Sequence, residues 1–235
     1  MLDRDTRWGG FRNARDLGGL PLRGGGLTRS GAVVRSASVD AVTDVGWANA
    51  WEDGFRTVID LRDGPTSTAP GPADRFDRLL VPLDDSGDTA FWSDVRAQGI
   101  DGTPLYVRPF LERKADRCAT VVAAVAAARP GGVIIHCAAG RDRTGIVALL
   151  LLALAGVEPE AIVEDYSLSS SRLGPLFAEL GRPDEAPAIE RLMRRRGVTT
   201  RDVLLQTLAE TDVAGLLIGA GVTPDTLSAA RERLL

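Results

Sequence analysis

Cys137 and Arg143 are the two residues whose types and spacing best suit chemistry. Five residues separate them, in the run His-Cys-Ala-Ala-Gly-Arg-Asp-Arg-Thr-Gly from His136 to Gly145. A strand-like apolar stretch precedes this loop and a helix-like stretch follows it. In that context backbone N–H groups converge on one point, which also receives the positive end of the helix. A phosphate dianion fits such a site, because the planar Arg143 guanidinium can bind two of its oxygens.

The same electrostatic field stabilises a thiolate. A cysteine at a helix N-terminus commonly has its pKa lowered to ~3.5–7.5, so we expect Cys137 to be ionised and to attack phosphorus. The reaction then passes through a phosphocysteine intermediate. We expect neither a metal nor a cofactor, since Arg143 and the loop amides stabilise the charge, and we expect Thr144 to donate a hydrogen bond to the departing sulfur. The predicted substrate-binding residues are Ala138, Ala139, Gly140, Arg141 and Thr144.

The leaving group needs a general acid, and two aspartates are candidates. Asp84 follows a strand-like stretch at 78–81, whereas Asp142 lies inside the loop. The simpler interpretation of Asp84 is that it lies in a solvated turn and has no catalytic role. Because the sequence does not separate the two, Asp142 and Asp84 are both predicted catalytic residues beside Cys137 and Arg143.

Three neighbouring features each allow two interpretations. His136 either acts as a base for Cys137 or fixes the loop, and we favour the second because adjacent strand residues point to opposite faces. Arg141 either faces the pocket mouth, where it would favour polyanionic substrates, or pairs with Asp142 or another acid. Cys137 itself could be a buried structural cysteine, but the two arginines and the aspartate beside it argue against that; Cys118, in an apolar helical stretch, is expected in the core.

Strand-like and helix-like stretches alternate before the C-terminal third. Strands are predicted near 32–36, 57–61, 78–81 and 133–135, and helices after Thr43 and over 116–129 and 144–155. Residues 84–109 are ambiguous between a short helix and a mobile segment, and only helices are predicted from Pro159 onward. The pattern predicts an α/β fold, with a mostly parallel sheet flanked by helices. Residues 1–235 are expected to form one domain, with 158–235 as a helical layer or a lid.

Composition narrows the class of protein. The 235 residues are 44% hydrophobic and 26% charged, with a net charge of −4, which argues against a nucleic-acid-binding protein. Two cysteines do not suggest a disulfide framework. No signal peptide is apparent after Met1 and the apolar run 146–155 is too short to span a bilayer, so a cytoplasmic location is expected. Export without a signal peptide stays open, and the sequence does not predict an oligomeric state.

The loop resembles the Cys-x5-Arg motif of the protein tyrosine phosphatases. Its longer form resembles a bacterial branch that includes mycobacterial tyrosine phosphatase B and lipid-active relatives. Further similar segments are Asn13–Asp16, Val34–Ser36, Ile59–Arg62, Glu164–Tyr166 and Gly221–Leu235. The branch usually has Lys at the position of Arg141 and Phe at that of Ala14, and 168–196 matches only vaguely.

The resemblance implies a tyrosine-phosphatase-like fold and hydrolysis of phosphotyrosine. It leaves phosphoserine, phosphothreonine and phosphoinositides open as further substrates, so the expected partners are phosphorylated proteins or phosphoinositides. The Trp-Pro-Asp loop of the larger enzymes is absent, but Asp84 stands where the branch has an Asp after its third strand. A phosphate-binding pseudophosphatase and a rhodanese-like sulfur transferase are the alternatives; the intact Cys137 and Arg143, followed by Thr144-Gly145, favour a phosphatase.

Overall fold

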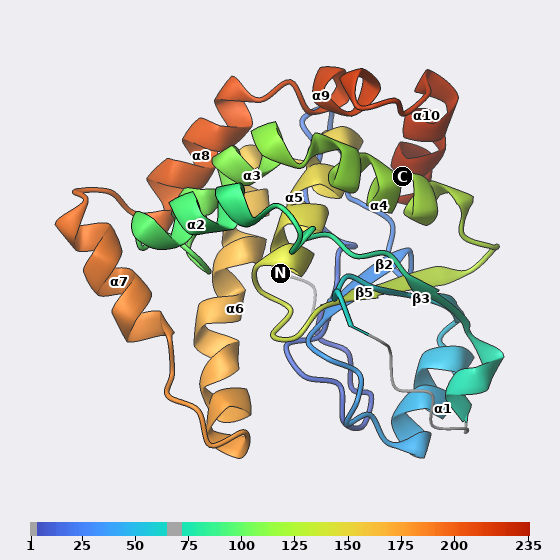
Figure 1. Cartoon of the computed structure of the whole chain (residues 1–235). Helices are drawn as coiled ribbons and strands as arrows, with labels where there is room; N and C mark the ends of the chain where they lie inside the picture. Colours follow the sequence, from blue (N-terminus) through green and yellow to red (C-terminus); the bar gives the residue numbers. More distant parts are fainter. Residues whose placement is uncertain (1–3, 65–71) are drawn as a thin grey trace.

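The protein is built on a five-stranded sheet with helices on both faces (Figure 1). The computed structural model describes residues 4–64 and 72–235. In spatial order the strands are β1 (Arg15–Asp16), β2 (Val33–Ser36), β5 (Gly132–His136), β3 (Phe55–Asp60) and β4 (Asp77–Leu80). Only the β1–β2 pair is antiparallel; the other three pairs are parallel. The α/β fold with a mostly parallel sheet is therefore confirmed.

The central strand β5 is buried on both faces. Val133 and Ile135 face one apolar cluster, while Ile134 faces the other, as the alternation of side chains along a strand requires. A parallel strand covered on both sides reads as a continuous apolar run, which is why Val-Ile-Ile was recognisable in the sequence. This strand delivers His136 and the following loop to the carboxyl edge of the sheet.

The smaller apolar cluster lies between the sheet and α1 (Asp44–Glu52). Thr43 caps this helix as predicted, and its side chain accepts a hydrogen bond from the N–H of Gly46. Trp8, Phe11 and Trp47 pack edge to face in this layer. A 3-10 turn, η1 (Pro72–Arg75), leads into the edge strand β4; of the proline-rich stretch before it, residues 65–71 lie outside the described residues.

The larger apolar cluster lies on the opposite face. It holds α4 (Ala115–Ala127) and α5 (Arg143–Ala155), and α5 is buried on nearly all sides. Gly156 ends α5 in the left-handed region with φ 82°. The cluster also includes Cys118, which is fully buried as predicted.

The ambiguous stretch 84–109 contains three short elements. They are α2 (Thr89–Ala97), η2 (Pro104–Tyr106) and the start of α3 (Val107–Arg113). Phe91, Trp92 and Val95 form the buried face of α2. Elements this short give little periodicity, so the sequence alone did not assign them.

The last third of the chain is helical, as predicted. Its helices are α6 (Pro159–Glu179), α7 (Ala186–Arg195), α8 (Thr200–Glu210), α9 (Val213–Gly219) and α10 (Pro224–Arg233). Helix α10 packs against α4 and α5, and α8 packs against α6, whereas α7 projects at the side of the molecule (Figure 1). Across residues 4–64 and 72–235, no helix combines the length and apolar character that crossing a membrane requires.

Candidate active site

The loop between β5 and α5 requires glycine at its middle. Gly140 has φ +69°, and a Cβ atom there would lie 2.5 Å from the carbonyl oxygen of Ser36. Both the backbone conformation and the close approach to β2 exclude a larger residue. The loop therefore packs directly on the end of the neighbouring strand.

Three consecutive carbonyl groups of the loop bond outward, away from its centre. The bonds are Ser38 N–H to Ala138 O at 2.9 Å, Asn13 Nδ2 to Ala139 O at 3.0 Å and Arg35 Nη2 to Gly140 O at 2.8 Å. Because a trans peptide is planar, the N–H of each of these peptide units points the opposite way, toward the interior of the loop. One of them, the Gly140 N–H, donates to the Cys137 sulfur at 3.2 Å.

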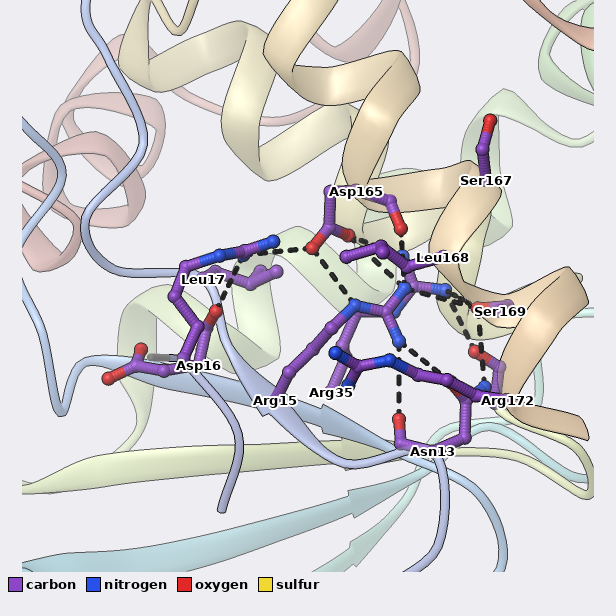
Figure 2. A network of polar contacts seen from close by, with 12 residues as sticks. Asn13, Arg15, Asp16, Leu17, Arg35, Asp165, Ser167, Leu168, Ser169 and Arg172 are labelled. Carbon is purple, nitrogen blue, oxygen red and sulfur yellow. Dashed lines mark hydrogen bonds and ion pairs between the residues drawn. The ribbon is translucent and has the colours of Figure 1, made fainter. Parts of the chain in front are cut away.

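Two of the three donors, Asn13 and Arg35, belong to a buried network of polar contacts around Asp165 (Figure 2). Asp165 of α6 accepts from Arg15 Nε at 3.0 Å and from Arg35 Nη1 at 2.7 Å, and it pairs with Arg4 at 2.9 Å. Burial opposes ionisation of Asp165, but these guanidinium groups outweigh it and hold its pKa well below its usual range. Burial lowers the pKa of Arg15 to about 9, and the Arg35 charge acts in the same direction. Ser169, one turn along α6, accepts from Asn13 and Arg15.

Cys137 is only 2% exposed at the base of the loop. Thr144, in the first turn of α5, is fully buried, and its hydroxyl has no hydrogen-bond partner among the described residues. His136 is also buried: Nδ1 lies 3.3 Å from the carbonyl oxygen of Cys137 and Nε2 lies 3.7 Å from Asp60. Burial lowers the pKa of His136. These contacts hold the ring against the end of β5, which agrees with the loop-fixing interpretation.

Arg143 and Asp84 form an ion pair in the wall of a small cavity. Their charged groups lie 3.2 Å apart, and each side chain is about one-fifth exposed, at 21% and 22%. Burial raises the pKa of Asp84 to about 6 despite the opposing effect of Arg143. Burial would lower the pKa of Arg143, but electrostatic interaction with Cys137 and Asp84 raises it above its ordinary value. Trp92 positions the Asp84 turn, because its Nε1 donates to the carbonyl oxygens of Asp84 and Asp85 at 3.2 Å.

Asp142 is held differently from Asp84. Arg141 Nε and Nη2 bind its two oxygens at 2.9 and 3.1 Å, and Arg141 Nη2 also donates to Glu185 at 2.8 Å. Burial raises the pKa of Asp142, although Arg141 opposes that effect. Arg141 is itself only 5% exposed. Of its two predicted roles, the ion pair with Asp142 is the one that the structure contains.

The cavity beside Arg143 has a volume of about 300 Å³. Its lining residues are Asp63, Asp84, Ser86, Trp92, Arg96, Asp101, Gly102, Tyr106, Asp142 and Arg143. A larger cavity, of about 820 Å³, opens beside Trp8 and Asn49 and contains none of the loop residues. In the described part of the chain, no group of three or more His, Cys, Asp and Glu side chains is placed to hold a metal ion.

The structure brings some of the predicted residues together, and it adds others. Asp84, Asp142 and Arg143 line one cavity, whereas Cys137, Ala138, Ala139, Gly140, Arg141 and Thr144 are not among its lining residues. Cys137 belongs to the same loop as Asp142 and Arg143. Asn13, Arg35 and Asp165 occur in segments similar to the family, but the sequence assigned them no role. Nothing in the sequence marked Glu185 or Trp92 as part of the site, because their positions depend on how α2 and α7 pack.

Known phosphatases are similar to this chain over much of its length. The model of the tyrosine phosphatase family matches residues 6–235. The triple specificity protein phosphatase PtpB of Mycobacterium tuberculosis is 28% identical over 255 residues, which cover 88% of this chain and 92% of that protein. A putative tyrosine-protein phosphatase of Cupriavidus necator is 33% identical over 178 residues, covering 72% and 64%. A tyrosine-protein phosphatase of Nostoc commune is 33% identical over 147 residues, covering 60% and 49%.

Proposed function

Since this chain belongs to the tyrosine phosphatase family and is a protein-tyrosine phosphatase, we propose that Cys137 carries the reaction through a phosphocysteine intermediate. The observation that carries this proposal is the loop with its carbonyl groups bonded outward and the Gly140 N–H directed at the Cys137 sulfur. Such a cradle stabilises both a thiolate and the oxygens of a phosphate. The Arg143 guanidinium supplies the fixed positive charge.

In the first step the Cys137 thiolate forms a bond to phosphorus as the bond from phosphorus to the ester oxygen breaks. The leaving oxygen takes a proton from a carboxylic acid. In the second step water attacks phosphorus, the carboxylate accepts a proton from that water, and the thiolate leaves with inorganic phosphate as the product. The Thr144 hydroxyl, for which the described residues offer no hydrogen-bond partner, is suited to donate to the sulfur as it leaves.

Asp84 is the better candidate for the acid. Its carboxyl group lines the cavity beside Arg143, and its pKa is raised to about 6, which keeps a useful fraction protonated near neutral pH. Asp142 lines the same cavity, but both of its oxygens accept hydrogen bonds from Arg141. A carboxylate held in that way orients the loop more readily than it transfers a proton.

The aromatic wall of the cavity supports phosphotyrosine as the main substrate. Trp92 and Tyr106 line it, and packing in the larger apolar cluster holds both rings in place. The edges that reach the cavity form a rigid apolar wall for a phenyl ring. Phosphoserine and phosphothreonine reach less far from the peptide backbone. The relative named a triple specificity phosphatase supports a wider range, and phosphoinositides remain part of the range to be assayed.

The decisive experiment is Cys137→Ser, assayed on an aryl phosphate and for vanadate binding. Turnover should be lost while the oxyanion still binds, because Arg143 and the loop amides remain. Cys118→Ala is the matched control, since Cys118 is buried in α4 and burial raises the pKa of its thiol to about 12. It should keep the turnover per folded molecule. Activity retained by Cys137→Ser would refute the mechanism, and wild-type binding without turnover would indicate a pseudophosphatase.

Metal independence is a separate part of the proposal. Activity should survive EDTA, because Arg143 and the loop amides supply the charge stabilisation that a metal would otherwise give. Loss of activity with EDTA and its recovery with Zn²⁺ or Mg²⁺ would contradict this.

A further inference from the structure

The cavity beside Arg143 carries more negative than positive groups. Four of its lining residues are aspartates and two are arginines. Arg143 is already paired with Asp84. Asp63 and Asp101 are exposed, and within the described residues neither has an ion pair or a hydrogen bond through its side chain. These two carboxylates are therefore available to a bound molecule.

Arg141, a further cation near the cavity, does not offset these carboxylates. Arg141 Nη2 would lie only 3.4 Å from a Cβ atom on Gly102, which lines the cavity. Its charge, however, is balanced by Asp142 and Glu185, and its side chain is almost fully buried. Arg96, on α2, is the exposed arginine of the cavity. The surroundings of the phosphate site thus remain net negative.

The carboxylates also affect one another. Burial is the largest cause of the raised pKa of Asp84, and the charges of Asp63, Asp142 and Asp101 act in the same direction against Arg143. A substrate that brings further anions would add to this repulsion. A substrate that brings a cation would relieve it.

We propose that Asp63 and Asp101 select phosphotyrosine in basic surroundings, that is, a phosphopeptide with arginine or lysine beside the phosphorylated residue. The inference rests on the proposed function of the Cys137 loop and adds the substrate class. The loop and Arg143 bind the phosphate, and the two aspartates at the cavity bind the cation that accompanies it. Opposite charges that face each other across an interface give specificity and faster association.

Two phosphotyrosine peptides of equal length test the proposal, one with arginines and one with aspartates on both sides of the phosphotyrosine. The quantity measured is the ratio of their kcat/KM values. Wild type should favour the arginine peptide by more than about tenfold, and the preference should shrink at high salt. The double variant Asp63→Asn, Asp101→Asn should lower the ratio by about fivefold or more, the scale of one lost charge pair near a surface. Arg96→Ala should raise the ratio.

Asp94→Asn is the matched control, because Asp94 is an exposed carboxylate of α2 that lies outside this cavity. It should leave the ratio unchanged; an equal fall there would assign the effect to overall charge and overturn the inference. A wild-type ratio near one, or faster turnover of a phosphoinositide than of the arginine peptide, would also overturn it. An aryl phosphate distinguishes failure of the proposed function from failure of this inference. If the protein does not hydrolyse the aryl phosphate, the proposed function is wrong. If it hydrolyses the aryl phosphate but shows no preference between the peptides, only this inference is wrong.

Discussion

Arg143 Nη1 lies 3.2 Å from Asp84 Oδ2, so the residue proposed to bind phosphate is paired with the proposed acid before substrate arrives. A phosphate dianion competes for the same guanidinium. When it binds, Asp84 loses its partner and comes to lie beside two negative charges, and both changes favour the protonated carboxyl group. In the proposed mechanism, substrate binding therefore prepares the acid for the first step.

The first prediction concerns this acid. Asp84→Asn should lower kcat by roughly 10²–10⁴-fold on a substrate with a poor leaving group, because the leaving oxygen can no longer receive a proton. The wild-type kcat/KM, which reports the free enzyme, should fall as pH rises above about 6, where Asp84 ionises. The variant should lack this basic limb. Asp142→Asn is the comparison: it should keep the basic limb. If the limb is lost in Asp142→Asn instead, the acid is Asp142.

The second prediction concerns stability and the same carboxyl group. Its pKa is raised above the ordinary value, so the folded state binds the proton more tightly than the unfolded state does. That stabilisation is complete below about pH 4 and is lost as pH rises through about 6. Asp84→Asn, which does not titrate, should therefore be more stable than wild type at pH 8, by up to about 3 kcal/mol. Urea denaturation at pH 4 and pH 8 measures the difference, and an equal difference at both would contradict it.

The third prediction is that Arg141 is a structural residue. Because Arg141 is buried between Asp142 and Glu185, Arg141→Ala should weaken turnover of an aryl phosphate and of a phosphoinositide by similar factors. Glu185→Gln, which removes only one of the two partners, should give a smaller loss on both. A selective loss of turnover on the phosphoinositide would contradict this prediction and support a role for Arg141 in binding polyanionic substrates at the pocket mouth.

The fourth prediction concerns Asp165. Asp165→Asn leaves Arg15 and Arg35 buried with fewer counter-charges, and breaking such a pair typically costs about 3–5 kcal/mol. The contribution of the ionised carboxylate is present at neutral pH and is lost as pH falls through its lowered pKa. Thermal denaturation measures the loss. Glu179→Gln, which breaks an exposed pair with Arg12, should cost less than about 1 kcal/mol, and equal costs would contradict the role of burial.

Local patterns made the sheet and the loop predictable. The apolar run before Cys137 and the Thr43 cap each act within a few residues, so the sequence alone carries their signal. The Cys137–Arg143 spacing likewise fixes the loop between a strand and a helix. Short elements such as α2 were not predicted, because about two turns of helix contain too few buried positions to show a helical period.

Contacts between distant segments were not predictable in the same way. The choice between the two roles of Arg141 depends on Glu185, which lies 44 residues away. The raised pKa of Asp84 likewise depends on burial and on carboxylates from three other segments. Neither arrangement has a spacing that a single sequence could reveal.

The outward bonds of the Cys137 loop have a consequence for the order in which the chain folds. Asn13 and Arg35 reach the loop across 126 and 105 residues, and Arg35 reaches Asp165 across 130. Contacts over such distances form late, because the loop-closure entropy must be overcome first. A chain emerging from the ribosome has no Asp165 to balance Arg15 and Arg35 until α6 has been made. Catalytic competence should therefore arise only after synthesis has passed α6, and in refolding it should follow the formation of helix rather than accompany it.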